Sequence, residues 1–443
     1  MNAIFFFIVV IAFLVAAYRQ VTESVVAGTP SAMEALGTGM IEAAKGSVTL
    51  VLGLIGVMAL FLGLMKVAEA GGLLTIIAKL LRPILVRLFP DIPAEHPAMG
   101  AMIMNLSANV MGLGNAATPF GIRAMQELDK LNPHKGTASD SMVLFLAINT
   151  SSITLLPTGV IALRAAAGSS DPAGIVPTTL FATLCSTIVA IFAATYFARL
   201  WGKPKVTAGA PAKIDQPSSA PEELEPDTPA TVGEAAQAAQ QGAAYPLWVT
   251  VATLVMVVAM IPLTIFYGSR ISPWIIPALM LGLLAFGYFR GVAVYEVFVE
   301  GARDGFEVAV RIIPYLVAIL VAVGMFRASG AMELLIGPLG SITALFGLPA
   351  DALPMAILRP LSGSGAYGIL ASTIQNPTIG PDSYTGYLVS TLQGSTETTF
   401  YVLAVYFGAV QIRRVRHALA AGLTADVAGI AAAILICTIL YGS

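Results

Sequence analysis

A polar strip interrupts an otherwise apolar region of the chain at Asn105-Leu106-Ser107-Ala108-Asn109-Val110-Met111-Gly112-Leu113-Gly114-Asn115. A strip of the same character recurs in the second half, at Arg359-Pro360-Leu361-Ser362-Gly363-Ser364-Gly365. Each strip is followed by an apolar run that itself holds polar residues, Asn149 to Ser152 in the first half and Gln393 to Thr399 in the second. Polar groups at membrane depth are costly without partners, so these four segments predict a binding site or a path through a membrane protein.

The composition predicts an all-α polytopic membrane protein. The chain has 443 residues, of which 57% are hydrophobic and 11% charged, and its mean hydropathy is +0.84. Its apolar runs repeatedly reach the length that spans a bilayer, so lipid is one expected partner. No basic cluster is large enough to indicate nucleic acid as another partner.

The sequence gives no sign of an enzyme or of a nucleotide-driven pump. It contains no Walker A motif, no GxGxxG after a strand and no HExxH. Two cysteines and three histidines show no metal-ligand spacing, so no cofactor and no structural metal are expected, apart from a coupling Na⁺ or H⁺.

An acidic, Ala- and Pro-rich segment divides the chain into two membrane halves. We expect membrane domains over residues 1–201 and 245–443, joined by a flexible linker over 202–244 that cannot bury enough apolar surface to fold. The halves are related, because Glu42-Ala43-Ala44-Lys45 resembles Glu300-Gly301-Ala302-Arg303. In each half this tetrapeptide precedes an apolar span, an amphipathic stretch, the polar strip and two further apolar runs.

One additional apolar span, Tyr245 to Tyr267, separates the two repeats, so they must face opposite sides of the membrane. We therefore expect two inverted repeats, about nine spanning helices, one re-entrant helical hairpin entering from each side, and amphipathic interfacial helices. The basic residues gather on one side if the N-terminus is cytoplasmic, as the positive-inside rule requires.

The polar strips and the broken runs that follow them supply the candidate binding residues. Glycines let the backbone turn and expose its amides and carbonyls, while amide and hydroxyl side chains can both donate and accept hydrogen bonds. Such a set suits a hydroxylated or heterocyclic solute, or coordination of Na⁺. The competing interpretation is that these small polar residues only join neighbouring helices. The candidates are Asn105, Asn109, Asn115, Asn149, Thr150, Ser151, Ser152, Arg359, Ser362, Ser364, Gln393, Ser395, Thr396, Glu397 and Thr398.

Glu397 is the sharpest single candidate, because it is a carboxylate inside an apolar run. Such a group is strongly desolvated unless it is paired. It could carry a coupling proton, ligate a cation or bind a substrate hydroxyl. Arg359 could neutralise it, or could itself bind an anionic substrate. Only the second repeat carries these charges, so we expect ion coupling to lie near Glu397.

Several motifs resemble a known family. The segments Leu62 to Ala70 (LGLMKVAEA), Asn105 to Ala124 (NLSANVMGLGNAATPFGIRA) and Phe145 to Thr158 (FLAINTSSITLLPT) resemble spore maturation protein A. Arg359 to Ala366 (RPLSGSGA) and Gln393 to Tyr401 (QGSTETTFY) resemble spore maturation protein B. Both belong to a nucleoside recognition, or gate-domain, superfamily that includes concentrative nucleoside transporters and the membrane part of the ferrous iron transporter B.

The resemblance implies a multi-pass protein of the cell inner membrane with paired re-entrant hairpins. In the nucleoside transporters the hairpin tips and the adjacent broken helices bind nucleoside and Na⁺. By position this implicates Asn105, Asn109, Asn149, Thr150, Ser151, Ser362, Ser364, Gln393, Ser395 and Glu397. The acidic and amide pattern of those transporters is not reproduced here, which argues against nucleoside as the substrate. The gate cysteines of the iron transporter are missing too.

Our leading hypothesis is an ion-coupled transporter of a small polar or anionic solute, driven by H⁺ or Na⁺, with one hairpin opening on each side. The alternative is a membrane scaffold or solute-sensing gate that moves nothing. We also expect a homo-oligomer, as is common among gate-family proteins.

Overall fold

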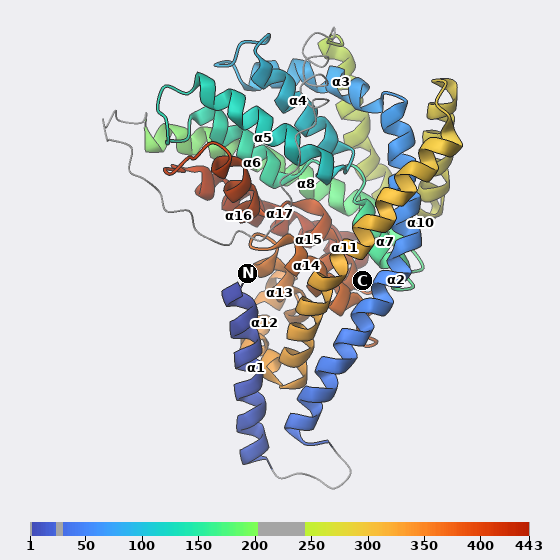
Figure 1. The fold of residues 1–443 in the computed structure, drawn as a ribbon, viewed down its shortest axis with the longest axis vertical. Helices are drawn as coiled ribbons and strands as arrows, with labels where there is room; N and C mark the ends of the chain where they lie inside the picture. Colours follow the sequence, from blue (N-terminus) through green and yellow to red (C-terminus); the bar gives the residue numbers. More distant parts are fainter. Residues whose placement is uncertain (1, 24–29, 203–243, 443) are drawn as a thin grey trace.

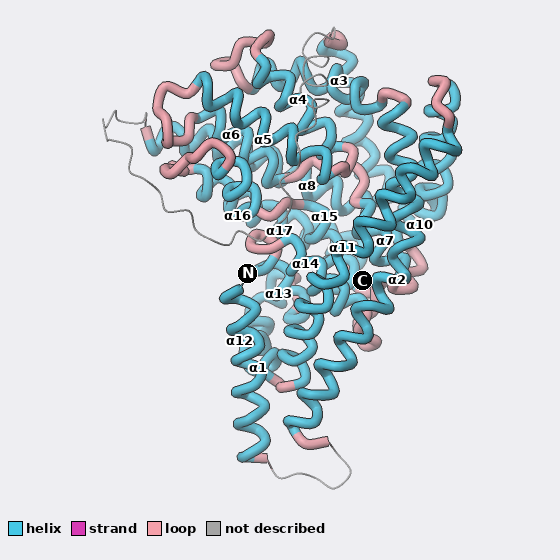
Figure 2. Tube along the Cα trace, in the orientation of Figure 1, coloured by secondary structure: helices cyan, strands magenta, loops and turns pink. Residues whose placement is uncertain are grey.

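The computed structural model describes residues 2–23, 30–202 and 244–442, and within them it is helical, with one isolated β-bridge between Thr137 and Arg414. The expected linker over 202–244 falls almost wholly outside the described residues, so that boundary stays a prediction. The fold confirms the all-α class. Figures 1 and 2 show helices throughout, with short non-helical segments inside the helical body as well as at its ends.

The first repeat follows one N-terminal helix, α1 (Asn2–Thr22). Its elements are α2 (Ala32–Ala70), α3 (Leu73–Leu88), α4 (Pro97–Val110), α5 (Gly114–Leu131), α6 (Asp140–Ser151), α7 (Thr158–Ala166), the short η1 (Pro172–Gly174) and α8 (Ile175–Trp201).

The second repeat follows α10 (Leu247–Phe289). Its elements are α11 (Val294–Ala328), α12 (Ala331–Thr343), η2 (Ala344–Phe346), η3 (Ala350–Ala352), α13 (Leu353–Leu358), α14 (Gly363–Ile374), α15 (Tyr384–Ser395), α16 (Thr399–Val402), the π-helical turn η4 (Leu403–Phe407) and α17 (Ala418–Tyr441). The order of elements matches the first repeat: long helix, amphipathic helix, hairpin, broken helix, long helix.

The same local signals begin the equivalent helices. Left-handed glycines, Gly72 at φ 84° and Gly330 at φ 77°, precede α3 and α12 and turn the chain sharply after the long helices. Ser139 and Ser383 cap α6 and α15, each accepting a hydrogen bond from a backbone amide of the first turn. The halves therefore share local geometry as well as element order.

Helix α10 folds back on itself. A straight helix of its 43 residues would be about 65 Å long. Yet its start lies against the middle of α3, where Tyr245 N donates to Lys79 O and Thr250 Oγ1 to Leu80 O. Its end packs Phe286 against Gly71, just before α3 begins. Both ends of α10 therefore lie beside α3, which a straight helix of this length could not achieve.

Among the described residues, four helices are long and apolar enough to cross a membrane: α1, α2, α8 and α17. A fifth results if the pair Gly337–Phe346 and Ala350–Leu358, bent by 101°, is taken as one span. The expected count of nine rested on apolar runs in the sequence. The structure divides several of these runs among shorter helices, most clearly α6 with α7 and α15 with α16.

The repeats pack against each other through their equivalent helices. Helix α2 lies along α11, where Gly63, Gly301 and Gly305 let the backbones approach closely, and α8 lies along α17. Figure 1 shows α3, α4 and α5 at one end of the molecule and α12 and α13 towards the other. The two hairpins therefore enter from opposite sides, as expected for inverted repeats.

Candidate functional site: the crossing of two broken helices

Two helices break where the sequence places polar residues inside apolar runs. Helix α6 ends at Ser151 and resumes as α7 at Thr158, while α15 ends at Ser395 and resumes as α16 at Thr399. The breaks touch, because Glu397 N donates to Thr150 O at 2.8 Å. We call this region the crossing. It comprises residues 149–157 and 393–400, the hairpin residues 105–113 and 359–363, and Tyr406 and Asp426, which hydrogen-bond to them.

Each break is also tied to the hairpin of its own repeat. Leu155 N donates to Val110 O at 3.0 Å, and Phe400 N donates to Pro360 O at 3.1 Å. At the first tip Gly112 has φ 77°, and a Cβ there would come within 2.7 Å of Leu156 O, so only glycine fits. The four predicted polar segments thus converge, although they lie far apart in sequence.

A network of neutral amides fills the first half of the crossing. Asn109 Nδ2 donates to Asn149 Oδ1 at 3.0 Å, and Asn149 Nδ2 donates to Phe145 O. Asn105 Nδ2 donates to Ala117 O at 2.8 Å and to the hydroxyl of Tyr406 at 3.1 Å. Tyr406, which comes from the second repeat, also donates to Asn149 Oδ1 at 3.4 Å. The network therefore joins the two repeats.

A buried guanidinium organises the second half. Arg359 is 5% exposed; its Nη1 donates to Thr398 Oγ1 at 3.0 Å and its Nη2 to Thr396 O. Nη2 also lies 3.7 Å from Glu397 Oε2. Glu397 is less buried than the apolar sequence suggested, since its side chain is 46% exposed. Arg359 is thus the fixed, enclosed charge of this half, and Glu397 is its open partner.

Hydroxyl groups surround both breaks, and most of them donate within the protein. Thr150, Ser151 and Ser395 each bond a carbonyl one turn earlier in their own helix. Across helices, Ser151 Oγ lies 2.9 Å from Thr187 Oγ1 of α8. Within the first break, Ser152 Oγ lies 2.9 Å from Thr154 Oγ1. For these residues the geometry is that of helix packing, although the oxygen lone pairs remain available to accept.

The remaining predicted residues differ in how closely they approach the crossing. Ser362 caps α14, because its Oγ accepts a hydrogen bond from Gly365 N at 3.0 Å. The hydroxyl oxygens of Ser362 and Ser364 lie 3.5 Å apart. Gln393 is buried, and its Oε1 has no hydrogen-bond partner among the described residues. The same is true of Oδ1 of Asn105. The side chain of Asn115 lies outside the described part of the structure.

Two residues at the crossing were missed from the sequence. Tyr406 was hidden because it lies in η4, where nothing marks which face turns inward. Asp426 is a carboxylate in the middle of α17, 2% exposed, and Thr399 Oγ1 donates to its Oδ2 at 2.7 Å. The available signal for Asp426 was its position as the single charged residue of a 24-residue apolar helix.

Two arginine clusters fasten the repeats at the two ends of the broken helix α6–α7. At the end of α7, the fully buried Arg164 donates to Pro381 O at 2.6 Å and to Asp382 Oδ1 at 3.1 Å. At the start of α6, Arg416 donates to Asp140 Oδ1 at 2.6 Å. We call these the Arg164 latch and the Arg416 latch.

The Arg164 latch holds its carboxylate ionised. Partial burial by itself raises the pKa of Asp382, but hydrogen bonds from Ser169 and Ser170 and the charge of Arg164 outweigh it. The net result is a pKa for Asp382 below its ordinary value. Each latch pairs an arginine of one repeat with an aspartate of the other.

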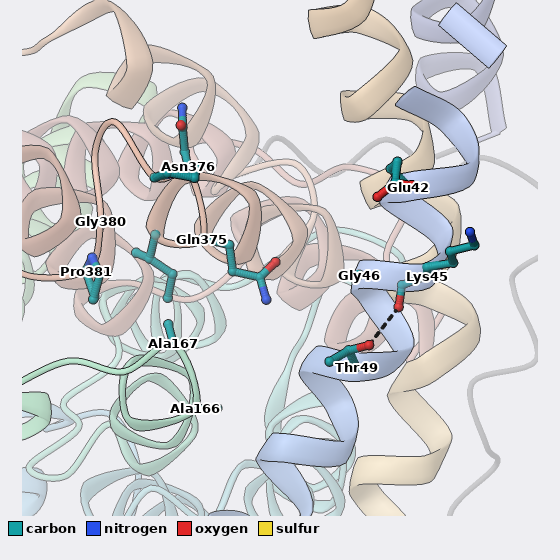
Figure 3. Close-up of a pocket in the computed structure, with 12 residues that line it drawn as sticks. Glu42, Lys45, Gly46, Thr49, Ala166, Ala167, Gln375, Asn376, Gly380 and Pro381 are labelled. Carbon is teal, nitrogen blue, oxygen red and sulfur yellow. Dashed lines mark hydrogen bonds between the residues drawn. The ribbon is translucent and has the colours of Figure 1, made fainter. Parts of the chain in front are cut away.

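A cavity of about 690 Å³ lies apart from the crossing, between α2 and the segments that follow α7 and α14. Figure 3 shows Glu42 and Thr49 on α2 facing it from one side, and Gln375 and Asn376 from the other. No predicted site residue lines it, although Glu42 and Lys45 belong to the repeated tetrapeptide. It offers a reference site at a distance from the crossing.

Inverted gate repeats with opposed hairpins and broken helices define the class: a helical multi-pass membrane protein with paired gate domains. The family described as "Gate: Nucleoside recognition" matches the chain twice, at residues 51–167 and 309–413. The chain belongs to this family. The two matches contain both hairpins and both breaks, so the family's domain is the unit that builds each side of the crossing.

Two curated relatives come from Bacillus subtilis (strain 168). The chain is 47% identical to spore maturation protein B over 168 residues, which are 38% of this chain and 93% of the relative. It is 50% identical to spore maturation protein A over 165 residues, which are 37% of this chain and 84% of the relative. These matches confirm the resemblance and fit a chain in which two such proteins are fused. No solved structure was found to match the chain.

Proposed function

We propose that the chain moves a small polar or anionic solute across the membrane through the crossing. The observation that carries the proposal is the convergence of two hairpin tips and two broken helices, from repeats that enter from opposite sides, on one set of buried polar groups. Inverted repeats with broken helices meeting in the interior are a recurring transporter plan. Each hairpin would then be the gate of one side.

The charge of Arg359 favours an anionic or strongly polar solute. The guanidinium is enclosed, and its carboxylate partner is half-exposed at 3.7 Å, beyond a direct hydrogen bond. An anion that reaches the crossing could replace Glu397 at Arg359, because a guanidinium binds carboxylate or phosphate oxygens in two parallel hydrogen bonds. The amide network, neutral and able to donate and accept, would orient the rest of the solute.

Ligand-dependent stability tests the proposal first. Purified protein in nanodiscs is screened by thermal shift against small carboxylates, phosphates, nucleosides and polyols. A solute that binds the folded state at 100 times its Kd raises the stability by about 2.7 kcal/mol. Solutes that stabilise the protein are then tested for uptake into proteoliposomes.

Matched variants locate the binding. We expect Arg359→Gln and Asn149→Ala to abolish both the thermal shift and the uptake, whereas Gln375→Ala, in the reference cavity, leaves both intact. A solute whose binding survives both crossing variants would overturn the site. Binding without uptake would instead support a solute-sensing gate.

We further propose that the protein lies in the cell inner membrane with a cytoplasmic N-terminus, as the basic residues favour. Single cysteines at Ser341 and Thr137, in a Cys185→Ala, Cys437→Ala background, report the orientation. Membrane-impermeant maleimide added to intact cells should label position 341 and spare position 137. The reverse pattern would invert the topology.

A further inference from the structure

Asp426 is the most enclosed carboxylate of the crossing. It lies in α17, 2% exposed, and receives a hydrogen bond from Thr399 Oγ1 at 2.7 Å on Oδ2. Its other oxygen, Oδ1, has no hydrogen-bond partner among the described residues. A buried carboxylate is held by ion pairs, by several donors, by a bound cation or by protonation. One neutral hydroxyl does not meet that requirement.

Helix α17 is shaped to bring Asp426 against both breaks. Gly422 and Gly429 flank it on one face of the helix, at spacings of four and three residues. A Cβ at Gly422 would come within 2.7 Å of Thr399 Cγ2 and 3.8 Å of Thr150 Oγ1. At Gly429 it would come within 2.7 Å of Thr396 Cγ2. The carboxyl therefore lies where the two broken helices meet, not at a peripheral contact.

Few charges face Asp426 from the elements packed around it. Arg359 of the second hairpin tip interacts with it electrostatically. Helix α17 has no other acidic or basic residue, α15 has none, and those of α6 and α8, Asp140 and Arg199, lie at the far ends of their helices. Further titratable groups on the elements that surround α17 include Glu397 in the break, Tyr401 and Tyr406 in α16–η4, and Cys185 on α8. One cation thus acts on Asp426, and Glu397 competes for it.

We propose that Asp426 is the proton-binding residue of the crossing and that it, rather than Glu397, carries the coupling proton. The coupling role of Asp426 rests on the proposed transport function, whereas its ability to bind a proton does not. The step is a simple acid–base exchange. Oδ1 of the carboxylate takes a proton from water that reaches the crossing from one side and returns it to water on the other. No other bond changes.

Arg359 supplies the coupling. While its charge is free to act on Asp426, it stabilises the carboxylate form. An anionic solute that binds Arg359 cancels this charge, so Asp426 then takes up a proton. By linkage the reverse holds, and protonation of Asp426 strengthens binding of the anion. A proton is favoured over Na⁺ because, within the described part of the chain, this carboxyl is hydrogen-bonded to one side-chain oxygen, that of Thr399, whereas Na⁺ needs a shell of oxygens.

Infrared difference spectroscopy of the purified full chain in nanodiscs, titrated with pH and without any solute, tests the proton site directly. The wild type should show a carbonyl band of a buried protonated carboxyl, and Asp426→Asn should lose it. Glu397→Gln, the matched control in the same crossing, should keep it. A band that survives in Asp426→Asn, or disappears in Glu397→Gln, would overturn the assignment.

Two further variants keep the test sharp if Asp426→Asn does not fold. Thr399→Val removes the hydroxyl that bonds Oδ2, so the band should shift in frequency; an unchanged band would count against Asp426. Arg359→Gln imitates neutralisation by an anion and should move the titration midpoint upward by about one to three pH units. Arg359→Lys keeps the charge and should move it much less.

Melting temperatures measured in NaCl and in choline chloride distinguish Na⁺ binding from proton binding at Asp426. An increase in melting temperature with Na⁺ that is lost in Asp426→Asn would replace the proton by Na⁺ and overturn the proposal. Because none of these measurements uses a transported solute, a protein that fails to transport could still show the band. Failure of the proposed function and failure of the proton site are therefore distinguishable.

Discussion

The two halves of the crossing use the same backbone for different chemistry. In the first half the buried groups are amides that satisfy one another, Asn109 on Asn149 and Asn105 on Tyr406. In the second, the guanidinium of Arg359 bonds a hydroxyl and a carbonyl and faces carboxylates at Glu397 and Asp426. The backbone geometry that both repeats share determines where the site lies. The side chains that differ between the repeats determine its charge. Single substitutions in each half can test that division.

The largest effect is expected from removing the charge of the second half. Arg359→Ala leaves the buried Thr396 carbonyl and Thr398 hydroxyl without their donor, which should lower the free energy of unfolding by about 3 kcal/mol. Chemical unfolding followed by tryptophan fluorescence measures it. Arg199→Ala, on an exposed turn of α8, is the control and should change little. Equal losses in the two variants would show that Arg359 does not organise its half.

In the first half a single residue holds the network together. Asn149 accepts from Asn109 and Tyr406 and donates to Phe145 O, so Asn149→Ala should cost about 2 kcal/mol. Asn109→Ala removes one donor and should cost about half as much. The same unfolding measurement compares them. If Asn109→Ala is the more damaging, the network does not centre on Asn149.

Tyr406 joins the halves, and its hydroxyl is the next smaller contribution. Tyr406→Phe keeps the ring stacked on Phe145 and removes the bonds to Asn105 and Asn149, at a cost of about 1 kcal/mol. A double-mutant cycle with Asn105→Ala should give a coupling energy, whereas a cycle with the exposed Tyr196→Phe should give none. Coupling of equal size in both cycles would remove Tyr406 from the network.

The smallest effect is expected at the Arg164 latch, because Asp382 is partly exposed. The pKa of Asp382 is lowered in the folded protein, so its contribution is fully present above its ordinary pKa and is lost as the pH falls through the lowered value. Asp382→Asn should therefore reduce stability by less than about 1 kcal/mol near neutral pH. That difference should shrink below about pH 4, towards the ordinary pKa of an aspartate. A difference that grows on acidification would contradict the latch.

The sequence predicted the two hairpins, the two breaks and the charges of Arg359 and Glu397, but it missed Asp426 and Tyr406. Polar strips inside apolar runs located both hairpins and both breaks, because such interruptions are too costly to be accidental at membrane depth. Asp426 and Tyr406 were not predicted, because α17 and η4 are apolar on every side. Which face of such a helix is buried depends on the neighbouring helices. For the same reason Glu397 was expected to be enclosed, while the fold leaves it half-exposed.

The helix count was the least predictable quantity. Apolar runs suggest spans of uniform length, whereas α6 and α15 stop at twelve residues each and α10 continues for 43 residues through a fold-back. Hydropathy alone does not report where a helix stops when the break is stabilised by contacts with another repeat, such as the bond from Glu397 N to Thr150 O.

The hydrogen bond between the two breaks also bears on stoichiometry. Every crossing needs one amide-lined half and one charged half. A pair of charged halves would bring two copies of Arg359 and two of Asp426 together, and a pair of amide-lined halves would bring none. Joining both in a single polypeptide fixes their ratio at one to one during synthesis and favours the matched pairing, because each half is tethered to its partner. If the chain is cleaved between residues 203 and 243, the two pieces should therefore remain together, since the contacts that pair them lie in the crossing and the latches.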